Sequence, residues 1–148
     1  MLDGVSDLAE GPDGAGGVAP DSLYERVGGR RFFVELVGRF YAGVAVDELL
    51  RPLYPEDLGP PAERLALFLI QLAGGPREYE ALRGQPRLRL RHLEFPIGAA
   101  ERDAWLARMG AALDASGLGG AEEEELRAYF AKMASFLVNR GLAIGGTR

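Results

Sequence analysis

The chain has 148 residues, of which 47% are hydrophobic, and its formal net charge is −5. This length and composition are enough to bury one sizeable core, and the acidic balance argues against non-specific binding to nucleic acid or to an anionic membrane. The absence of Cys and the presence of one His exclude disulfides, iron–sulfur clusters and the usual structural zinc sets within one chain.

The two ends of the sequence differ in character from the rest. The first twenty residues carry five Gly and two Pro without apolar periodicity. Ordering such a segment would cost backbone entropy that burial could not offset, so we expect a disordered tail over 1–20. One domain over 21–141 and a short flexible tail over 142–148 follow. The N-terminus lacks the pattern of a secretory signal, and the longest apolar run is about half of a membrane span of ~20 residues, so we expect a cytoplasmic protein.

The chain after the tail is predicted to be all-α. A short helix begins at the capping box formed by Ser22 and Glu25 and ends at Gly28-Gly29. The next helix, over 30–45, presents one broad apolar face that includes Tyr41. Prolines limit residues 47–59 to a turn or two of tight helix, with Tyr54 at its tip.

The second half of the pattern is also helical. Pro60-Pro61 suits the first turn of a helix that ends at Gly74-Gly75, and a short helix over 76–82 is expected after it. The last two helices are predicted over 101–115, with Trp105 on the apolar face, and over 121–140. The acidic run Glu122 to Glu125 falls in the first turn of the last helix, where negative charge is favourable, so we interpret it as a solvated helix start rather than a metal site.

The only histidine, His92, lies in a stretch bounded by Pro86 and Pro96, which separate it from the neighbouring helices. Residues 87–92 alternate as a strand would, but no second alternating run exists to pair with them, so we do not expect a strand. A lone imidazole beside an apolar pocket can present one nitrogen to a haem iron. Taken alone, His92 is also compatible with a structural histidine.

Three aromatic residues with polar tips, Tyr41, Tyr54 and Trp105, could supply hydrogen-bond donors opposite such a ligand. Donors of this kind suit a diatomic gas that carries partial negative charge, such as oxygen. Each residue also has a structural interpretation, as a core residue with a satisfied tip or as a loop anchor. The inward faces lack the Glu and Glu-x-x-His pattern of helical di-iron sites, and nothing ties the serines to the one histidine in a nucleophile triad.

Several segments resemble, in order, those of the group II truncated haemoglobins. They are Leu-Tyr-Glu-Arg-Val-Gly-Gly, Arg-Phe-Tyr-Ala, Leu-Tyr-Pro-Glu-Asp, Gly-Gly-Pro-Arg-Glu-Tyr, Pro-Arg-Leu-Arg-Leu-Arg-His and Glu-Arg-Asp-Ala-Trp-Leu, between Ser22 and Arg140. The resemblance implies an all-α truncated globin fold, a two-over-two helical sandwich around haem.

The resemblance also implies roles for particular residues. His92 would ligate the iron of haem b, and Arg91 would meet a haem propionate. Tyr41, Tyr54 and Trp105 take the places of the residues that stabilise a bound gas. The expected haem-contacting walls are Phe40, Leu65, Phe68, Leu69, Phe95, Ile97 and Met133.

The chain departs from the family pattern at two places on the helix that begins at Pro60-Pro61. Pro61 stands where globins often carry a His or Gln, and proline offers no side-chain donor. Leu72-Ala73 replaces an aromatic pair, which would leave the pocket roomier. The resemblance therefore implies that Tyr41 and Trp105 donate to the bound gas, with Tyr54 as an additional donor.

The expected function is the binding of oxygen, nitric oxide and carbon monoxide at iron. Slow oxygen release would favour redox chemistry, as a nitric oxide dioxygenase or a peroxidase-like enzyme served by a reductase, over oxygen transport. Two alternatives stay open, a non-enzymatic carrier or gas sensor and a haem-free helical interaction module. We further expect no membrane or nucleic-acid partner, and a homodimer as the assembly.

Overall fold

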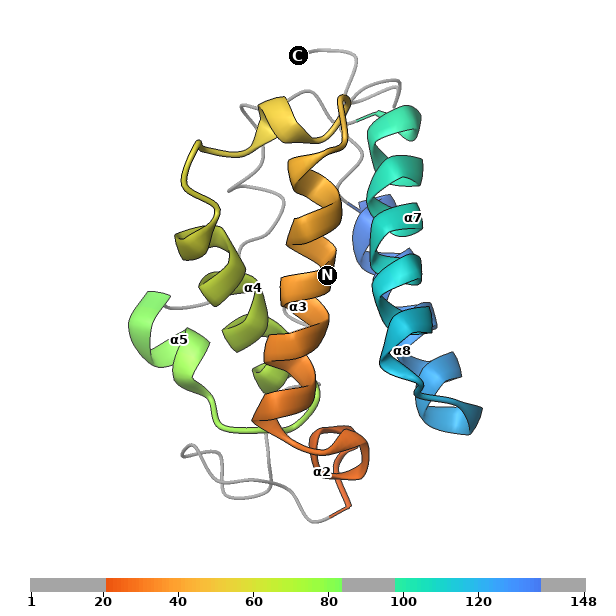
Figure 1. Cartoon of the computed structure of the whole chain (residues 1–148). Coiled ribbons are helices and arrows are strands. Elements are labelled where there is room, and N and C mark those ends of the chain that lie inside the picture. Colours follow the sequence, from red (N-terminus) through yellow and green to blue (C-terminus); the bar gives the residue numbers. More distant parts are fainter. Residues whose placement is uncertain (1–20, 84–97, 137–148) are drawn as a thin grey trace. The chain divides into compact units, whose positions relative to one another are not determined.

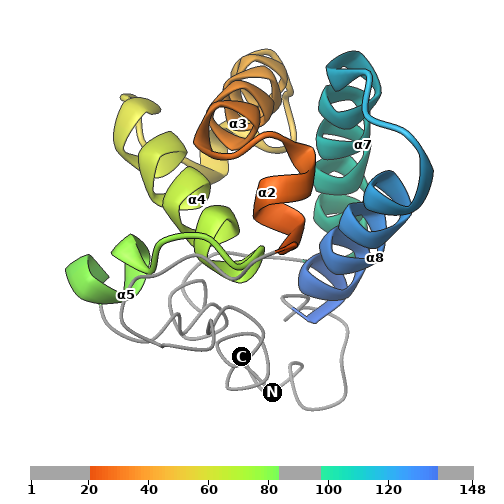
Figure 2. The ribbon, with the colours of Figure 1, turned by 90° about the horizontal axis from the view of Figure 1, so that it is seen from below.

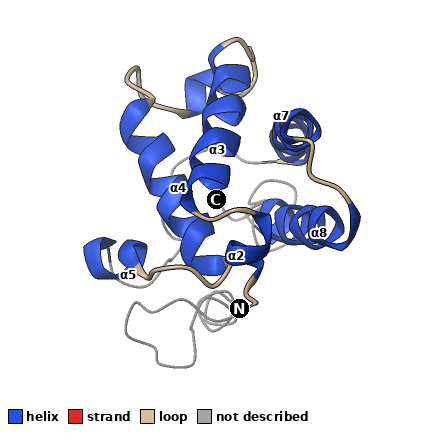
Figure 3. Ribbon diagram, turned by 60° about the horizontal axis from the view of Figure 1, so that its bottom comes forward, coloured by secondary structure: helices blue, strands red, loops and turns tan. Residues whose placement is uncertain are grey.

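The structure is a computed structural model, and it describes residues 21–83 and 98–136. Every regular element in these ranges is helical (Figures 1 and 3). The elements are α2 (Leu23–Val27), α3 (Arg30–Ala45), the 3-10 helix η1 (Arg51–Leu53), α4 (Gly59–Leu72), α5 (Glu78–Arg83), α7 (Ala99–Ser116) and α8 (Gly120–Phe136). These bounds confirm the predicted helices within the described ranges.

Several sequence predictions lie outside the described residues. They are the tails over 1–20 and 142–148, the interpretation of the stretch around His92, and the end of the last helix near Gly141. The domain limits of 21 and 141 stay a prediction. None of the helices described in 21–83 and 98–136 combines the length and the apolar character that crossing a membrane requires.

The described residues group into two compact units. Unit 1 contains residues 21–38 and 57–83, and unit 2 contains residues 39–56 and 98–136. The apolar face predicted for α3 is buried along its whole length. Its residues are each at most 8% exposed, namely Phe33, Leu36, Val37, Phe40, Tyr41 and Val44.

Unit 1 is built around the predicted start and stop signals. The amide of Glu25 donates to Ser22 Oγ at 3.2 Å, which caps α2, and Gly28 ends the helix at a φ of 114°. The amide of Tyr24 donates to the carbonyl of Ala73 at 2.9 Å, which joins the start of α2 to the end of α4.

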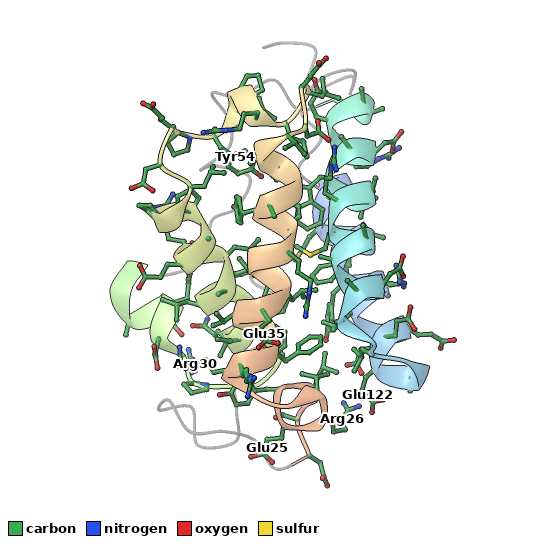
Figure 4. All side chains as sticks on the ribbon, in the orientation of Figure 1. Glu25, Arg26, Arg30, Glu35, Tyr54 and Glu122 are labelled. Carbon is green, nitrogen blue, oxygen red and sulfur yellow. The ribbon has the colours of Figure 1, made fainter. Side chains whose placement is uncertain are left out.

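Helices α4 and α5 of unit 1 contact one another (Figure 2). The Gln71 side chain, 1% exposed, accepts a hydrogen bond from the amide of Glu80 at 2.9 Å. An exposed ion pair joins Arg30, at the start of α3 (Figure 4), to Glu78 on α5 at 2.6 Å. The ion pair is solvent-accessible, so we expect it to contribute little stability, whereas the buried amide satisfies a backbone donor of α5.

In unit 2, α7 and α8 lie side by side (Figures 1 and 2). The Glu101 carboxylate accepts from the amide of Gly98 at 2.8 Å, and Gly117 ends α7 at a φ of 78°. In the first two turns of α8, Glu123 forms an ion pair with Arg127 at 2.7 Å. This pairing agrees with the interpretation of the acidic run as a helix start.

Candidate ligand-binding site

Unit 2 brings together the three predicted donors from three separate elements. Tyr41 lies on α3, Tyr54 directly follows η1 and is labelled in Figure 4, and Trp105 lies on α7. The apolar period of α3 directs Tyr41 inward, where it is 8% exposed. Tyr54 has extended backbone, with a φ of −120° and a ψ of 156°, because the 3-10 turn ends there.

The rings of these residues form an aromatic cluster. The Tyr41 and Tyr54 rings lie edge to face with centroids 5.4 Å apart. Phe40 contacts both Tyr41, at 4.9 Å between centroids, and Trp105, at 5.2 Å. Trp105 also contacts Phe130 of α8 at 6.0 Å. Such geometries add stability beyond simple burial, so the cluster can hold its polar tips in fixed positions.

Tyr54 is the centre of the hydrogen bonding in this cluster. Its hydroxyl forms side-chain hydrogen bonds with both Tyr41 and Trp105. Burial raises the pKa of Tyr54 from its ordinary value of 10.0 to about 12, and the two hydrogen bonds act in the opposite direction. Burial has the larger effect because a buried phenolate would lose the free energy of its hydration by water. Two hydrogen bonds to neutral groups compensate only part of that loss.

The direction of these hydrogen bonds follows from the chemistry of the groups. An indole N–H can only donate, so the Tyr54 oxygen accepts from Trp105. The hydrogen bond between Tyr41 and Tyr54 uses the proton of one of the two phenols. Tyr41, Tyr54 and Trp105 thus form a hydrogen-bonded trio, in which two of the three donor protons are used between its members. One phenolic proton is not used within the trio, and it lies in an aromatic wall.

The backbone around Tyr54 is fixed by Arg51. One guanidinium nitrogen, Nη1, donates to the carbonyls of Tyr54 and Pro55 at 3.3 and 2.9 Å. The other, Nη2, donates to the carbonyl of Glu56 at 2.8 Å. The guanidinium thus satisfies successive carbonyls that no helix uses, and it holds the extended segment that carries the Tyr54 ring.

The other predicted wall residues fall into three groups. Phe40 and Met133 are buried in unit 2, and Phe40 belongs to the aromatic cluster. Phe68 and Leu69 are buried on α4 in unit 1, where Leu65 is partly exposed. His92, Arg91, Phe95 and Ile97 lie outside the described residues. Contacts of all these residues with haem stay predictions.

The structure adds two features that the sequence did not single out. Phe130 packs on Trp105, and it is not among the walls that the resemblance implies. Arg108 of α7 forms an ion pair with Asp47 across 61 residues of sequence. Helical or strand periodicity in the sequence does not predict a contact between positions so far apart. The sequence shows only an acidic residue, Asp47, and a basic residue, Arg108, each within a few residues of a candidate donor.

The chain is similar to known globins over most of its length. The sequence model of the bacterial-like globin family matches residues 22–139. A group 2 truncated haemoglobin of Bacillus subtilis is 41% identical over 117 residues, which cover 79% of this chain and 88% of that protein.

Two solved structures are similar in both sequence and fold. A thermostable haemoglobin from Thermobifida fusca is 51% identical with a TM-score of 0.80, and the match covers 82% of this chain and 99% of that chain. A truncated oxygen-avid haemoglobin from Bacillus subtilis is 40% identical with a TM-score of 0.77, and the match covers 80% of this chain and 99% of that chain. These likenesses confirm the truncated globin fold predicted from the sequence.

Proposed function

This chain belongs to the group II truncated haemoglobins, and from that premise we propose that His92 ligates its haem iron while Tyr41, Tyr54 and Trp105 stabilise a bound gas. Membership of this globin family implies haem, with its iron, as the cofactor and haem-based oxygen binding as the function. The haem-free interaction module is therefore set aside.

The described residues of the site fit a haem pocket. Two phenols and one indole carry the polar tips, and Phe40 and Phe130 supply apolar wall next to Trp105. The Tyr54 phenol is uncharged at neutral pH, since burial raises its pKa to about 12. When bound, haem supplies an iron atom to which a diatomic gas can attach. The chain supplies His92 as the proposed ligand and neutral donors for the gas.

The observation that carries the proposal is the hydrogen bonding of Tyr54 with both Tyr41 and Trp105. Because Trp105 donates to the Tyr54 oxygen and the two phenols share a second hydrogen bond, one phenolic proton of the trio is not used within it and can be donated to a third acceptor. A hydrogen bond to an acceptor with partial negative charge contributes about 1.5 to 3 kcal/mol, which corresponds to roughly tenfold or more in affinity. We therefore infer slow gas release, with one phenol of the trio as the direct donor to the gas and Trp105 holding Tyr54 in place.

Slow release favours redox chemistry over oxygen transport. The likeness to a haemoglobin described as oxygen-avid supports this preference. We propose nitric oxide oxidation or peroxide activation, with a reductase as partner, in a cytoplasmic protein. A homodimer also stays a prediction. A carrier or gas sensor would use the same donors but would not turn over nitric oxide in the presence of a reductant.

Ligation by His92 is tested by the absorption spectrum of the holoprotein, reduced and exposed to carbon monoxide. The wild type should give the sharp, shifted Soret band of a histidine-ligated haem, and His92→Ala should lose it. Free imidazole added to His92→Ala should restore the band, because it replaces the missing nitrogen without altering the rest of the chain. A variant whose band equals that of the wild type without imidazole would rule out His92 as the ligand.

A further inference from the structure

An ion pair in unit 2 connects the segment that carries Tyr54 to the helix that carries Trp105. Arg108 lies one helical turn after Trp105 on α7, and its Nε donates to Asp47 Oδ2 at 2.9 Å. The Asp47 side chain is 13% exposed and that of Arg108 is 36% exposed. This pair is more enclosed than the exposed pairs elsewhere, such as Arg127 with Asp114, whose side chains are 40% and 72% exposed.

The second oxygen of Asp47 organises the chain that leads to η1. Asp47 Oδ1 accepts from the amides of Leu49 and Leu50 at 2.9 and 3.0 Å. The hydrogen bond from Arg108 and that from Leu50 hold the pKa of Asp47 below its usual value, so the carboxylate is ionised at neutral pH. Both carboxylate oxygens are thus committed, one to its own turn and one to α7.

The Arg108 side chain reaches Asp47 by passing over α3 at a glycine. A Cβ placed on Gly43 would lie 2.8 Å from Cδ of Arg108, so the aliphatic stem rests directly on the α3 backbone there. Gly43 is two residues after Tyr41. The stem therefore contacts α3, which carries Tyr41. The guanidinium of the same side chain holds the segment that carries Tyr54.

These contacts fix the path of the chain on both sides of Tyr54. Asp47 anchors the turn before η1, and Arg51 anchors the carbonyls from Tyr54 to Glu56. The position of the Tyr54 ring relative to Trp105 then depends on how the Asp47 turn is tied to α7. The ion pair between Asp47 and Arg108 is a side-chain contact that ties them.

We propose that Asp47 and Arg108 are positioning residues, which set where the Tyr54 hydroxyl lies between Tyr41 and Trp105 and thereby control the release of bound gas. The proposal rests on the function proposed above, because it acts through the donors of the trio. Neither residue touches the gas. A small displacement of the donor is enough to change the rate of gas release, since hydrogen bonds weaken steeply with distance and angle.

The test compares Arg108→Met with Arg127→Met in the haem-loaded protein. Methionine keeps an apolar stem over Gly43 but removes the guanidinium, whereas Arg127 forms its ion pairs with Glu123 and Asp114 instead of with Asp47. We expect oxygen dissociation to be about fivefold faster or more in Arg108→Met, as small misplacements of functional groups have large effects. The rate in Arg127→Met should stay within about twofold of the wild type, as expected for an exposed pair.

A spectroscopic readout separates positioning from a general loss of stability. The C–O stretching frequency of the carbon monoxide complex reports hydrogen bonding to the gas, and it should rise in Arg108→Met but not in Arg127→Met. Arg108→Lys should restore part of the wild-type frequency, since it keeps a donor. Asp47→Asn keeps the acceptor for the amides of Leu49 and Leu50 and should move the frequency in the same direction as Arg108→Met.

The Tyr54→Phe background decides whether the pair acts through Tyr54. There, Arg108→Met should cause little further change in rate or frequency. An undiminished effect in that background, or wild-type behaviour of both Arg108→Met and Asp47→Asn, would overturn the positioning role alone. An unchanged oxygen rate in Tyr54→Phe itself would remove Tyr54 as a donor and overturn both proposals.

Discussion

At the scale of single residues, Tyr54 combines burial with hydrogen bonds to two aromatic neighbours. Its ring contacts Tyr41 at 5.4 Å between centroids, and its hydroxyl bonds with Tyr41 and Trp105. Burial raises the pKa to about 12 despite these hydrogen bonds. The folded protein therefore favours the neutral phenol. Only the neutral phenol has an O–H group that can donate a hydrogen bond to a bound gas.

The raised pKa of Tyr54 predicts a pH dependence of stability. The folded pKa of about 12 lies above the ordinary value of 10.0, so the unfolded chain releases this proton first as the pH rises. Between pH 10 and 12 the folded state binds more protons, and the free energy of unfolding should fall by up to about 1.4 kcal/mol per pH unit. Urea unfolding at pH 9, 10 and 11 should reveal a steeper fall in the wild type than in Tyr54→Phe. Parallel curves would contradict the pKa shift.

The sequence identified the three donors because each lies on an apolar face or at a tight turn. It assigned Tyr54 only as an additional donor, since a single sequence does not tell which hydroxyl accepts and which donates. The structure gives Tyr54 the central place, because the indole of Trp105 has no acceptor and must donate to it. The direction of a hydrogen-bond network depends on the positions of all its members, which local patterns do not encode.

At the scale of elements, glycines act in two different ways in unit 1. Gly75 follows α4, and a Cβ there would lie 2.6 Å from Cδ1 of Tyr24 and 2.8 Å from Cγ2 of Ile70. Gly38 lies inside α3, is exposed, and would meet nothing within 4 Å. Gly75 permits the close packing of α2 on the end of α4. Gly38 makes no such close contact, and as a glycine inside a helix it raises the entropic cost of forming α3.

Alanine substitutions at these glycines should have opposite effects on stability. Gly75→Ala should lower the free energy of unfolding by about 1 to 3 kcal/mol, because a ring and a branched side chain must move. Gly38→Ala should raise it by about 0.5 to 1 kcal/mol, because alanine favours the helix and space is available. Urea unfolding at neutral pH measures both. A lower free energy of unfolding in Gly38→Ala would contradict the open space around Gly38.

The sequence predicted the described elements well because their signals are local. Prolines in the first turn, capping side chains and glycines at the ends determine the limits of α2, α3 and α4. The ion pair of Asp47 with Arg108 could not be predicted in this way. Its partners are 61 residues apart, and their meeting depends on how α7 packs in unit 2.

At the scale of the whole molecule, the order of short motifs along the chain carried the prediction of fold and cofactor. The family match over residues 22–139 confirms both. The assignment of His92 as the iron ligand stays a prediction, as it lies outside the described residues. What the structure contributes is the hydrogen bonding of Tyr54, which follows η1, with Tyr41 of α3 and Trp105 of α7.

The central claim is that this hydrogen-bonded trio holds the bound gas. The most direct measurement is the oxygen dissociation rate of the ferrous haem-loaded protein, by stopped flow, in the wild type, Tyr41→Phe and Tyr54→Phe. Tyr79→Phe serves as the matched control, because Tyr79 is also buried but packs on Phe68 in unit 1. We expect rates about tenfold faster or more in Tyr41→Phe and Tyr54→Phe, with Tyr79→Phe close to the wild type. Equal rates in all four proteins would contradict it.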